Sequence, residues 1–230
     1  RGSLAPMIDR TGREVSDEVP SRLARTNIDP VFSLPGKNSA DMRIAKEVLD
    51  DTNVLLSWGH RFHGMVPDEV AKRVTDAVLS GMGFIAMHSA HYSKPFKALM
   101  GTTCSLRWRD GDFERLWITS PSHPIAKGLP EYIELEEEEM YGEYFDIPAP
   151  DEIVGMGWFR GGEVFRSVCV FRRGLGKVIY FQPGHETNPT YKNKDIRKLI
   201  HNAASWAAAD TRAQAPTGSR HCEVPPESIK

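Results

Sequence analysis

The chain has 230 residues, of which 40% are hydrophobic and 26% charged, a balance typical of a soluble globular protein. Its 29 basic and 31 acidic residues nearly cancel, and no block of Lys and Arg indicates a nucleic-acid partner. No run approaches the ~20 apolar residues of a membrane span, and the first residues lack the apolar core of a secretory signal. The three cysteines are far apart in sequence, which favours reduced thiols in the cytoplasm over a disulfide framework.

Both ends of the chain differ in composition from its middle. Residues 1–40 are polar and lack sustained periodicity, so they predict an irregular or divergent N-terminal segment. Residues 210–230 have the same character and predict a disordered tail. The sequence therefore predicts a single ordered α/β domain over residues 41–209.

Helical and extended patterns alternate along the first half of this domain. The apolar stripe of residues 40–51 predicts a short helix, and "NVLLSWG" (53–59) predicts a strand buried on both faces. Residues 67–83 predict a helix that begins at a proline and two acids and ends at glycines. "FIAMH" (84–88) predicts a second buried strand, followed by a short helix over 93–101.

The second half of the domain begins with strand patterns and ends in a helix. Strands are predicted over 132–142, 152–159, 163–173 and 176–185, and a helix over 195–209. The alternation predicts a doubly wound, mostly parallel sheet with helices on both faces. The acidic strand and the hairpin-like segments after it are expected to form an antiparallel extension.

Three of the predicted buried strands lead into a histidine: His60, His88 and His185. Ligands of open α/β sheets bind beyond the carboxyl ends of the strands, so these side chains are expected to share one site. His63 and His91 each follow three residues after the first two. Imidazole is the commonest protein metal ligand and also an acid or base near neutral pH, so a divalent metal, with zinc as a candidate, is expected here.

The acidic run "ELEEEEMYGEYFD" supplies candidate carboxylates. Most of the run is expected to be a solvated face, because a strand turns only alternate residues inward. Glu139 and Glu143 would share one face of a continuous strand, with Tyr141 between them, whereas a bend would separate them. Either glutamate could complete a metal site or act as a general base.

Several blocks resemble the ThuA-like (trehalose utilisation) family, in order from about residue 41 to 209. The most specific are "HSAHYSKPFKALMGTTC" and "EEEMYGEYFDIP". The resemblance implies a flavodoxin-like sheet related to class I glutamine amidotransferases. It also implies a metal-dependent hydrolase or isomerase of sugars or keto-sugars, which is commonly a homo-oligomer.

The resemblance also implies roles for individual residues. The family's histidine positions match His60, His88 and His185 as metal ligands, and its acidic residue matches Glu139. Positions of a closer subgroup match His63, His91 and Glu143, with catalytic roles expected for Glu139, Glu143, His91 and Ser89. His63 and Tyr141 are expected to contact substrate.

Two rival functions stay open from the sequence. The amidotransferase relationship suggests a hydrolase with Ser89 as nucleophile and His185 as base. The glycine-flanked pattern of a nucleophile elbow is missing, however, because Ser89 has His88 before it and Ala90 after it. The other rival is a non-catalytic carbohydrate-binding or regulatory protein. It is favoured by residues 1–40, where the family's first strand-helix unit is expected to be missing or divergent.

Overall fold

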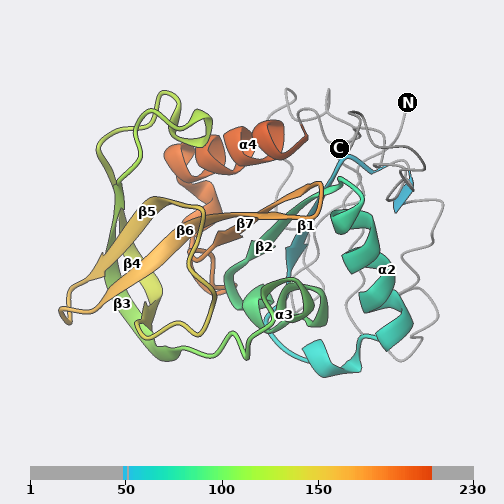
Figure 1. The fold of residues 1–230 in the computed structure, drawn as a ribbon. Helices are drawn as coiled ribbons and strands as arrows, with labels where there is room; N and C mark the ends of the chain where they lie inside the picture. The colour runs from blue at the N-terminus through green and yellow to red at the C-terminus, as the bar shows by residue number, and fades with distance from the viewer. Residues whose placement is uncertain (1–48, 51, 209–230) are drawn as a thin grey trace, which may run out of the picture.

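A computed structural model describes residues 49–50 and 52–208 of the chain, and their core is a seven-stranded sheet. The strand order is β1-β2-β7-β6-β5-β3-β4, and helices flank the first half of the sheet (Figure 1). The strands are β1 (Val54–Trp58), β2 (Gly83–Met87), β3 (Arg107–Ile118), β4 (Tyr132–Gly142), β5 (Glu152–Phe159), β6 (Val164–Arg173) and β7 (Gly176–Phe181). The helices are α2 (Asp68–Leu79), α3 (Lys94–Met100) and α4 (Lys194–Ala208).

The sheet is mixed, so the α/β class is confirmed but the prediction of a mostly parallel sheet is wrong. Only β1, β2 and β7 pair in parallel, and the pairings from β7 through β6, β5 and β3 to β4 are antiparallel. The reason lies in the connections. Short turns join β5 to β6 and β6 to β7, and a parallel pair needs a crossover of a dozen or more residues.

Strand β3 lies next to β5 and β4 in the sheet, and the sequence analysis did not predict it. Its first half is polar and exposed and contains Gly111, which obscures the pattern. Its second half alternates regularly: Glu114, Leu116 and Ile118 are buried, and the residues between them are partly exposed. That alternation is the signal that could have identified the strand.

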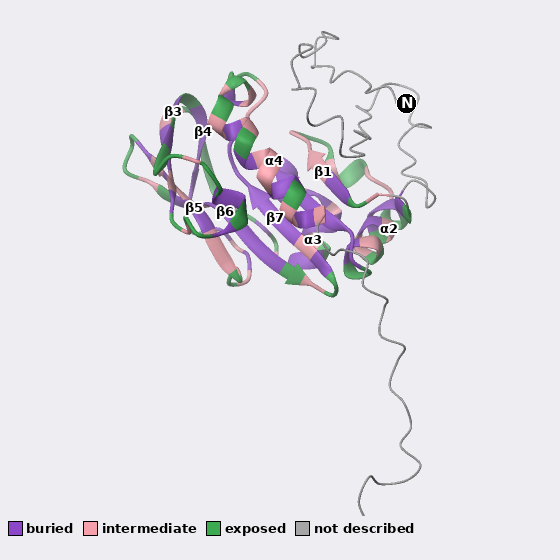
Figure 2. Cartoon of the chain, turned by 90° about the horizontal axis from the view of Figure 1, so that it is seen from above, coloured by how far each residue is buried: buried purple, intermediate pink, exposed green. Residues whose placement is uncertain are grey.

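The two faces of the sheet carry separate apolar clusters. On one face, Val74 and Val78 of α2 and Phe96 of α3 pack against alternate strand residues such as Phe84. On the other face, Ile196 and Leu199 of α4 pack against the intervening residues. Figure 2 shows the central strands of the sheet mostly in the colour of buried residues. Because both faces of the sheet are covered here, β2 is apolar throughout and β7 is apolar from Val178 to Phe181.

The predicted helices over 67–83, 93–101 and 195–209 are confirmed. The side chain of Ser93 caps α3 by accepting from the Phe96 N–H, and Gly101 ends this helix at φ 70°. The expectations for residues 1–40 and 210–230, and most of the helix predicted over 40–51, lie outside the described residues. None of the described helices is long and apolar enough to cross a lipid bilayer.

Candidate metal and carbohydrate site

The fold brings the three strand-end histidines together. Because β1, β2 and β7 are parallel neighbours, their carboxyl ends meet at the same edge of the sheet. One ligand atom from each of His60, His88 and His185 lies within 4.8 Å of the other two. The ring centroid of His185 is 5.1 Å from that of His60 and 5.5 Å from that of His88.

His88 is fully buried and held in one orientation. Its Nδ1 lies 2.9 Å from the main-chain oxygen of Gln182 and can only donate to it, which leaves Nε2 facing the site. Metal-binding histidines usually donate their second ring N–H in this way. The backbone of His88 has φ 51°, a left-handed conformation that a non-glycine residue rarely adopts and that occurs often at functional sites.

A buried carboxylate stands beside this nitrogen, since Glu139 Oε2 lies 2.9 Å from His88 Nε2. Burial raises the pKa of Glu139, but the hydrogen bond with His88 and the charges of His88 and His185 outweigh it, so the pKa lies below its ordinary value. Glu139 is therefore a carboxylate at neutral pH. It can act as a ligand or accept a proton.

Asp110 was not predicted as a site residue. It belongs to a second ligand group with Glu139 and His185, again with one atom from each within 4.8 Å. The Nδ1 of His185 is engaged at 2.8 Å by Thr187 Oγ1, which leaves one ring nitrogen for both groups. The two groups therefore share the remaining nitrogen of His185. Asp110 lies in an irregular, exposed stretch of β3, where no sequence pattern marks it.

The environment of His60 suits a bound cation. His60 Nδ1 and Glu186 Oε2 lie 3.0 Å apart, yet both atoms are buried without a hydrogen bond. Burial lowers the pKa of His60, Glu186 opposes this, and the charges of His185 and Arg61 reinforce it. A neutral imidazole is the form that binds a metal, so the histidines and carboxylates present suit a divalent ion.

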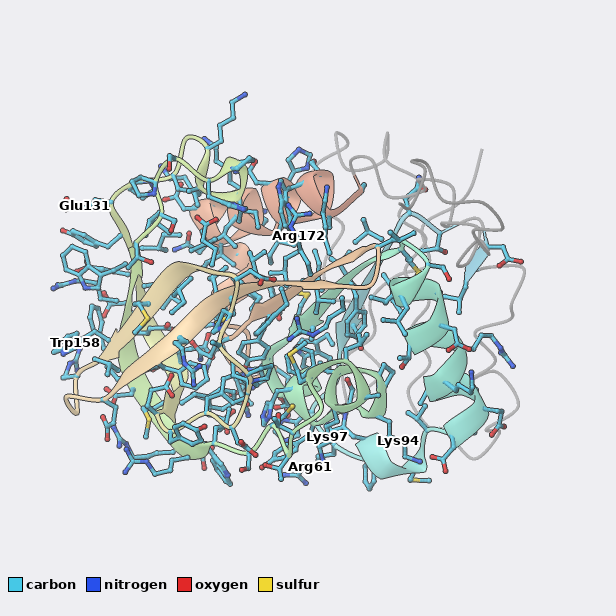
Figure 3. All side chains as sticks on the ribbon, viewed as in Figure 1. Arg61, Lys94, Lys97, Glu131, Trp158 and Arg172 are labelled. Atoms are coloured by element: carbon cyan, nitrogen blue, oxygen red, sulfur yellow. The ribbon has the colours of Figure 1, made fainter. Side chains whose placement is uncertain are left out.

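His63 lies beside this group in a short 3-10 turn, His63–Met65, between β1 and α2. Its Nε2 is buried without a hydrogen bond, and burial followed by the charges of Lys97 and His60 lowers its pKa. Figure 3 shows Lys97 and Arg61 at the same lower edge of the molecule, where β1 and β2 end. The basic side chains thus favour neutral histidines at this edge.

Tyr141 and Ser89 form a hydrogen-bonded pair next to His88. The Tyr141 hydroxyl lies 3.1 Å from Ser89 Oγ and 3.4 Å from His88 Nε2. Burial, and then the charge of Glu139, raise the pKa of Tyr141 well above its ordinary value, so its hydroxyl remains a donor. The strained turn expected of a nucleophile elbow falls on His88, and the partner of Ser89 is a tyrosine instead of a histidine.

The structure places His91 and Glu143 away from the ligand groups found among the described residues. His91 Nδ1 donates to the Cys104 carbonyl at 2.7 Å, and aromatic rings including Tyr141 and Phe145 surround its ring. Burial lowers the pKa of His91 to about 3. Glu143 follows the end of β4 and binds Arg166 at 2.8 and 2.9 Å, so the bend allowed for in the sequence analysis separates it from Glu139.

Glu138 is a further buried carboxylate that the sequence analysis assigned to the solvated face. Its oxygens accept from the N–H groups of Gly184 and His185 at 2.9 and 3.1 Å, and from the Thr190 hydroxyl at 2.6 Å. It thereby holds the loop that carries His185. Glu138 and Glu139 are consecutive and both buried, because both faces of β4 are covered from Glu138 onward, so the alternation of a half-exposed strand could not have identified the pair.

The family model for ThuA, described as trehalose utilisation, matches residues 21–207. The chain belongs to the ThuA family. A putative ThuA-like protein from Bacteroides uniformis is similar in structure, with a TM-score of 0.60 and 16% identity over 76% of this chain and 81% of that one. Another from Parabacteroides merdae has a TM-score of 0.57 and 16% identity over 70% and 72%.

A cytoplasmic protein from Salmonella typhimurium is also similar, with a TM-score of 0.50 and 11% identity over 78% of each chain. A comparison with curated protein sequences gives no match. At these identities the structural likeness shows the fold alone. What chemistry this ThuA-family chain can perform depends on its own site residues.

Proposed function

We propose that this ThuA-family protein is a metal-dependent enzyme of carbohydrate metabolism that hydrolyses or isomerises a sugar or keto-sugar. The observation that carries the proposal is the histidine group: three imidazoles from three strand ends have ligand atoms within 4.8 Å of one another. A buried carboxylate stands 2.9 Å from one of them. Imidazole nitrogens with a carboxylate and an open side are the donor set of catalytic zinc sites.

In this proposal His60, His88 and His185 hold the ion, with Glu139 or Asp110 completing the set. A bound divalent ion would polarise a keto or hydroxyl oxygen of the sugar and lower the pKa of a neighbouring proton. Glu139, kept ionised by His88 and His185, accepts that proton. Tyr141, kept protonated, donates a hydrogen bond to a substrate oxygen, and Ser89 orients the tyrosine.

Trp108 supports a sugar as the substrate. It is paired with Tyr141 across the β3–β4 ladder, and directly paired residues share one face of a sheet. Tyr141 faces the histidines, so Trp108 forms a wall on the same side, with 60% of its side chain exposed. An aromatic surface beside a few convergent polar groups is the usual composition of a small-molecule site.

The rival functions make different predictions. A Ser89–His185 hydrolase on a flavodoxin-like, amidotransferase-related fold would need Ser89 to leave Tyr141 and approach His185. A non-catalytic carbohydrate-binding protein would keep sugar affinity without turnover. We further propose that the protein acts in the cytoplasm, as the similar Salmonella protein is described, and as a homo-oligomer.

Elemental analysis of protein purified without a histidine tag tests the proposal. We expect a stoichiometric divalent metal in the wild type and its loss in His88→Ala and His185→Ala, because each removes one of three ligands. His201→Ala, a change on α4 outside the ligand groups, is the control and should keep the metal. A folded wild type that binds no divalent metal would refute the proposal, and covalent labelling of Ser89 by a serine-directed probe would favour the hydrolase.

A further inference from the structure

A chain of fully buried polar side chains runs from β3 to the histidine site. Ser167 Oγ on β6 lies 3.2 Å from Glu114 Oε1 and also 3.2 Å from the side-chain oxygen of Gln182. Gln182 Nε2 donates to the main-chain oxygen of Glu139 at 3.1 Å. The main-chain oxygen of Gln182 accepts from His88 Nδ1. The proposed mechanism assigns no role to Glu114, Ser167 or Gln182.

The hydrogen bonds among these side chains determine which group donates a proton in each contact. The Glu139 carbonyl can only accept, so the Gln182 amide must present its NH₂ there and its oxygen to Ser167. Ser167 has a single proton, and its acceptors are Gln182 Oε1 and Glu114 Oε1, each at 3.2 Å, and the Phe165 carbonyl at 3.5 Å. We assign this proton to Gln182, because a carboxylic acid can supply a proton of its own and the amide oxygen cannot. The remaining contact, between Ser167 Oγ and Glu114 Oε1, then needs a proton from Glu114.

The surroundings of Glu114 agree with a neutral acid. Its other oxygen, Oε2, is buried without a hydrogen bond, which is far less costly for a carbonyl oxygen than for an ionised one. Burial, and then the charge of Glu138, raise the pKa of Glu114 well above its ordinary value. A Cβ atom at Gly157 would lie 2.5 Å from Ser167 Oγ and 2.6 Å from Glu114 Oε1, so the two groups are packed tightly together.

We propose that Glu114 is a positioning residue: it remains a neutral carboxylic acid and, through Ser167 and Gln182, orients Glu139 and holds His88 with Nε2 directed into the site. This role rests on the proposed metal site for its functional meaning. The protonation of Glu114 and the orientation of His88 do not depend on a metal. Partners of this kind behind a metal ligand typically change metal affinity about 10- to 100-fold when removed.

Three variants test the hydrogen-bonded series that links Glu114 to His88. Glu114→Gln keeps a neutral donor of the same shape and should retain metal affinity within about threefold. Glu114→Leu removes the donor and should weaken metal binding by about tenfold or more. Ser167→Ala breaks the next link and should have a similar effect, and the double variant should be little worse than either single one, because both changes cut the same chain.

Two further measurements need no metal. Infrared spectra of the wild type should contain a carboxylic-acid C=O band that disappears in Glu114→Gln, and ¹⁵N NMR should show a His88 Nδ1–H resonance that shifts or exchanges faster in Ser167→Ala. An ionised Glu114, or an unchanged His88 Nδ1–H resonance together with unchanged metal affinity in folded Glu114→Leu and Ser167→Ala, would overturn the inference. A wild type that binds no metal but shows both spectroscopic signatures would refute the proposed function and leave the positioning role standing.

Discussion

The two halves of the sheet contribute different chemistry to the same site. The parallel half, β1, β2 and β7, ends in histidines, whereas the antiparallel half supplies the carboxylates of Glu139, Glu138, Asp110 and Glu114. In the parallel half the site side chains follow the ends of the strands, and the strand interiors are mostly apolar. The antiparallel strands deliver side chains from their interiors, which requires polar groups within the core and partners to satisfy them.

The largest expected change in stability tests whether the antiparallel half of the sheet holds the His185 loop of the parallel half. Glu138→Gln should lower the free energy of unfolding by about 3 kcal/mol, because its NH₂ group would face donors from Gly184, His185 and Thr190. Urea unfolding measures this. Glu137→Gln, an exposed neighbour on the same strand, is the matched control and should change stability by less than about 0.5 kcal/mol. Equal stability of the two variants would show that the antiparallel half does not hold the His185 loop.

A second prediction concerns His91 in the parallel half. Its folded pKa of about 3 lies below the unfolded value of 6.5, so the unfolded state binds the proton first and stability is lost as pH falls below 6.5. Between pH 6.5 and 4 this loss is roughly 3 kcal/mol. His91→Asn, which keeps a donor for the Cys104 carbonyl, should be less stable at pH 7 but show a flatter decline. Unfolding curves across that range measure it, and parallel declines in both proteins would contradict a neutral, buried His91.

The smallest effect separates Glu143 from the site. Glu143→Gln breaks the paired contact with Arg166 and should cost about 1 kcal/mol of stability, since the pair is partly exposed. Metal affinity should not change, because Glu143 belongs to neither ligand group. Isothermal titration with a divalent metal checks this. A large loss of metal affinity in this variant would return Glu143 to the site and weaken the contrast between the two halves.

The site residues that follow the end of a predicted strand could be identified from the sequence. His60, His88 and His185 follow apolar runs, and the rule that ligands bind beyond strand ends predicted that they would meet. Glu139 was a candidate only among several acids of its run. Asp110, Glu138 and Glu114 were missed, because each lies inside an antiparallel strand, where polar residues normally indicate the solvated face.

The sequence by itself determined the α/β class, the family, the three histidines that converge, and every α-helix and strand described after residue 52 except β3. Local periodicity and strand-end position suffice for these, because they depend on neighbours along the chain. Only the tertiary structure decided that most of the sheet is antiparallel, that Glu139 faces the histidines while Glu143 binds Arg166, and that Glu114 is linked to His88. These outcomes depend on strand register and on hydrogen bonds between residues far apart in sequence, which no local pattern encodes.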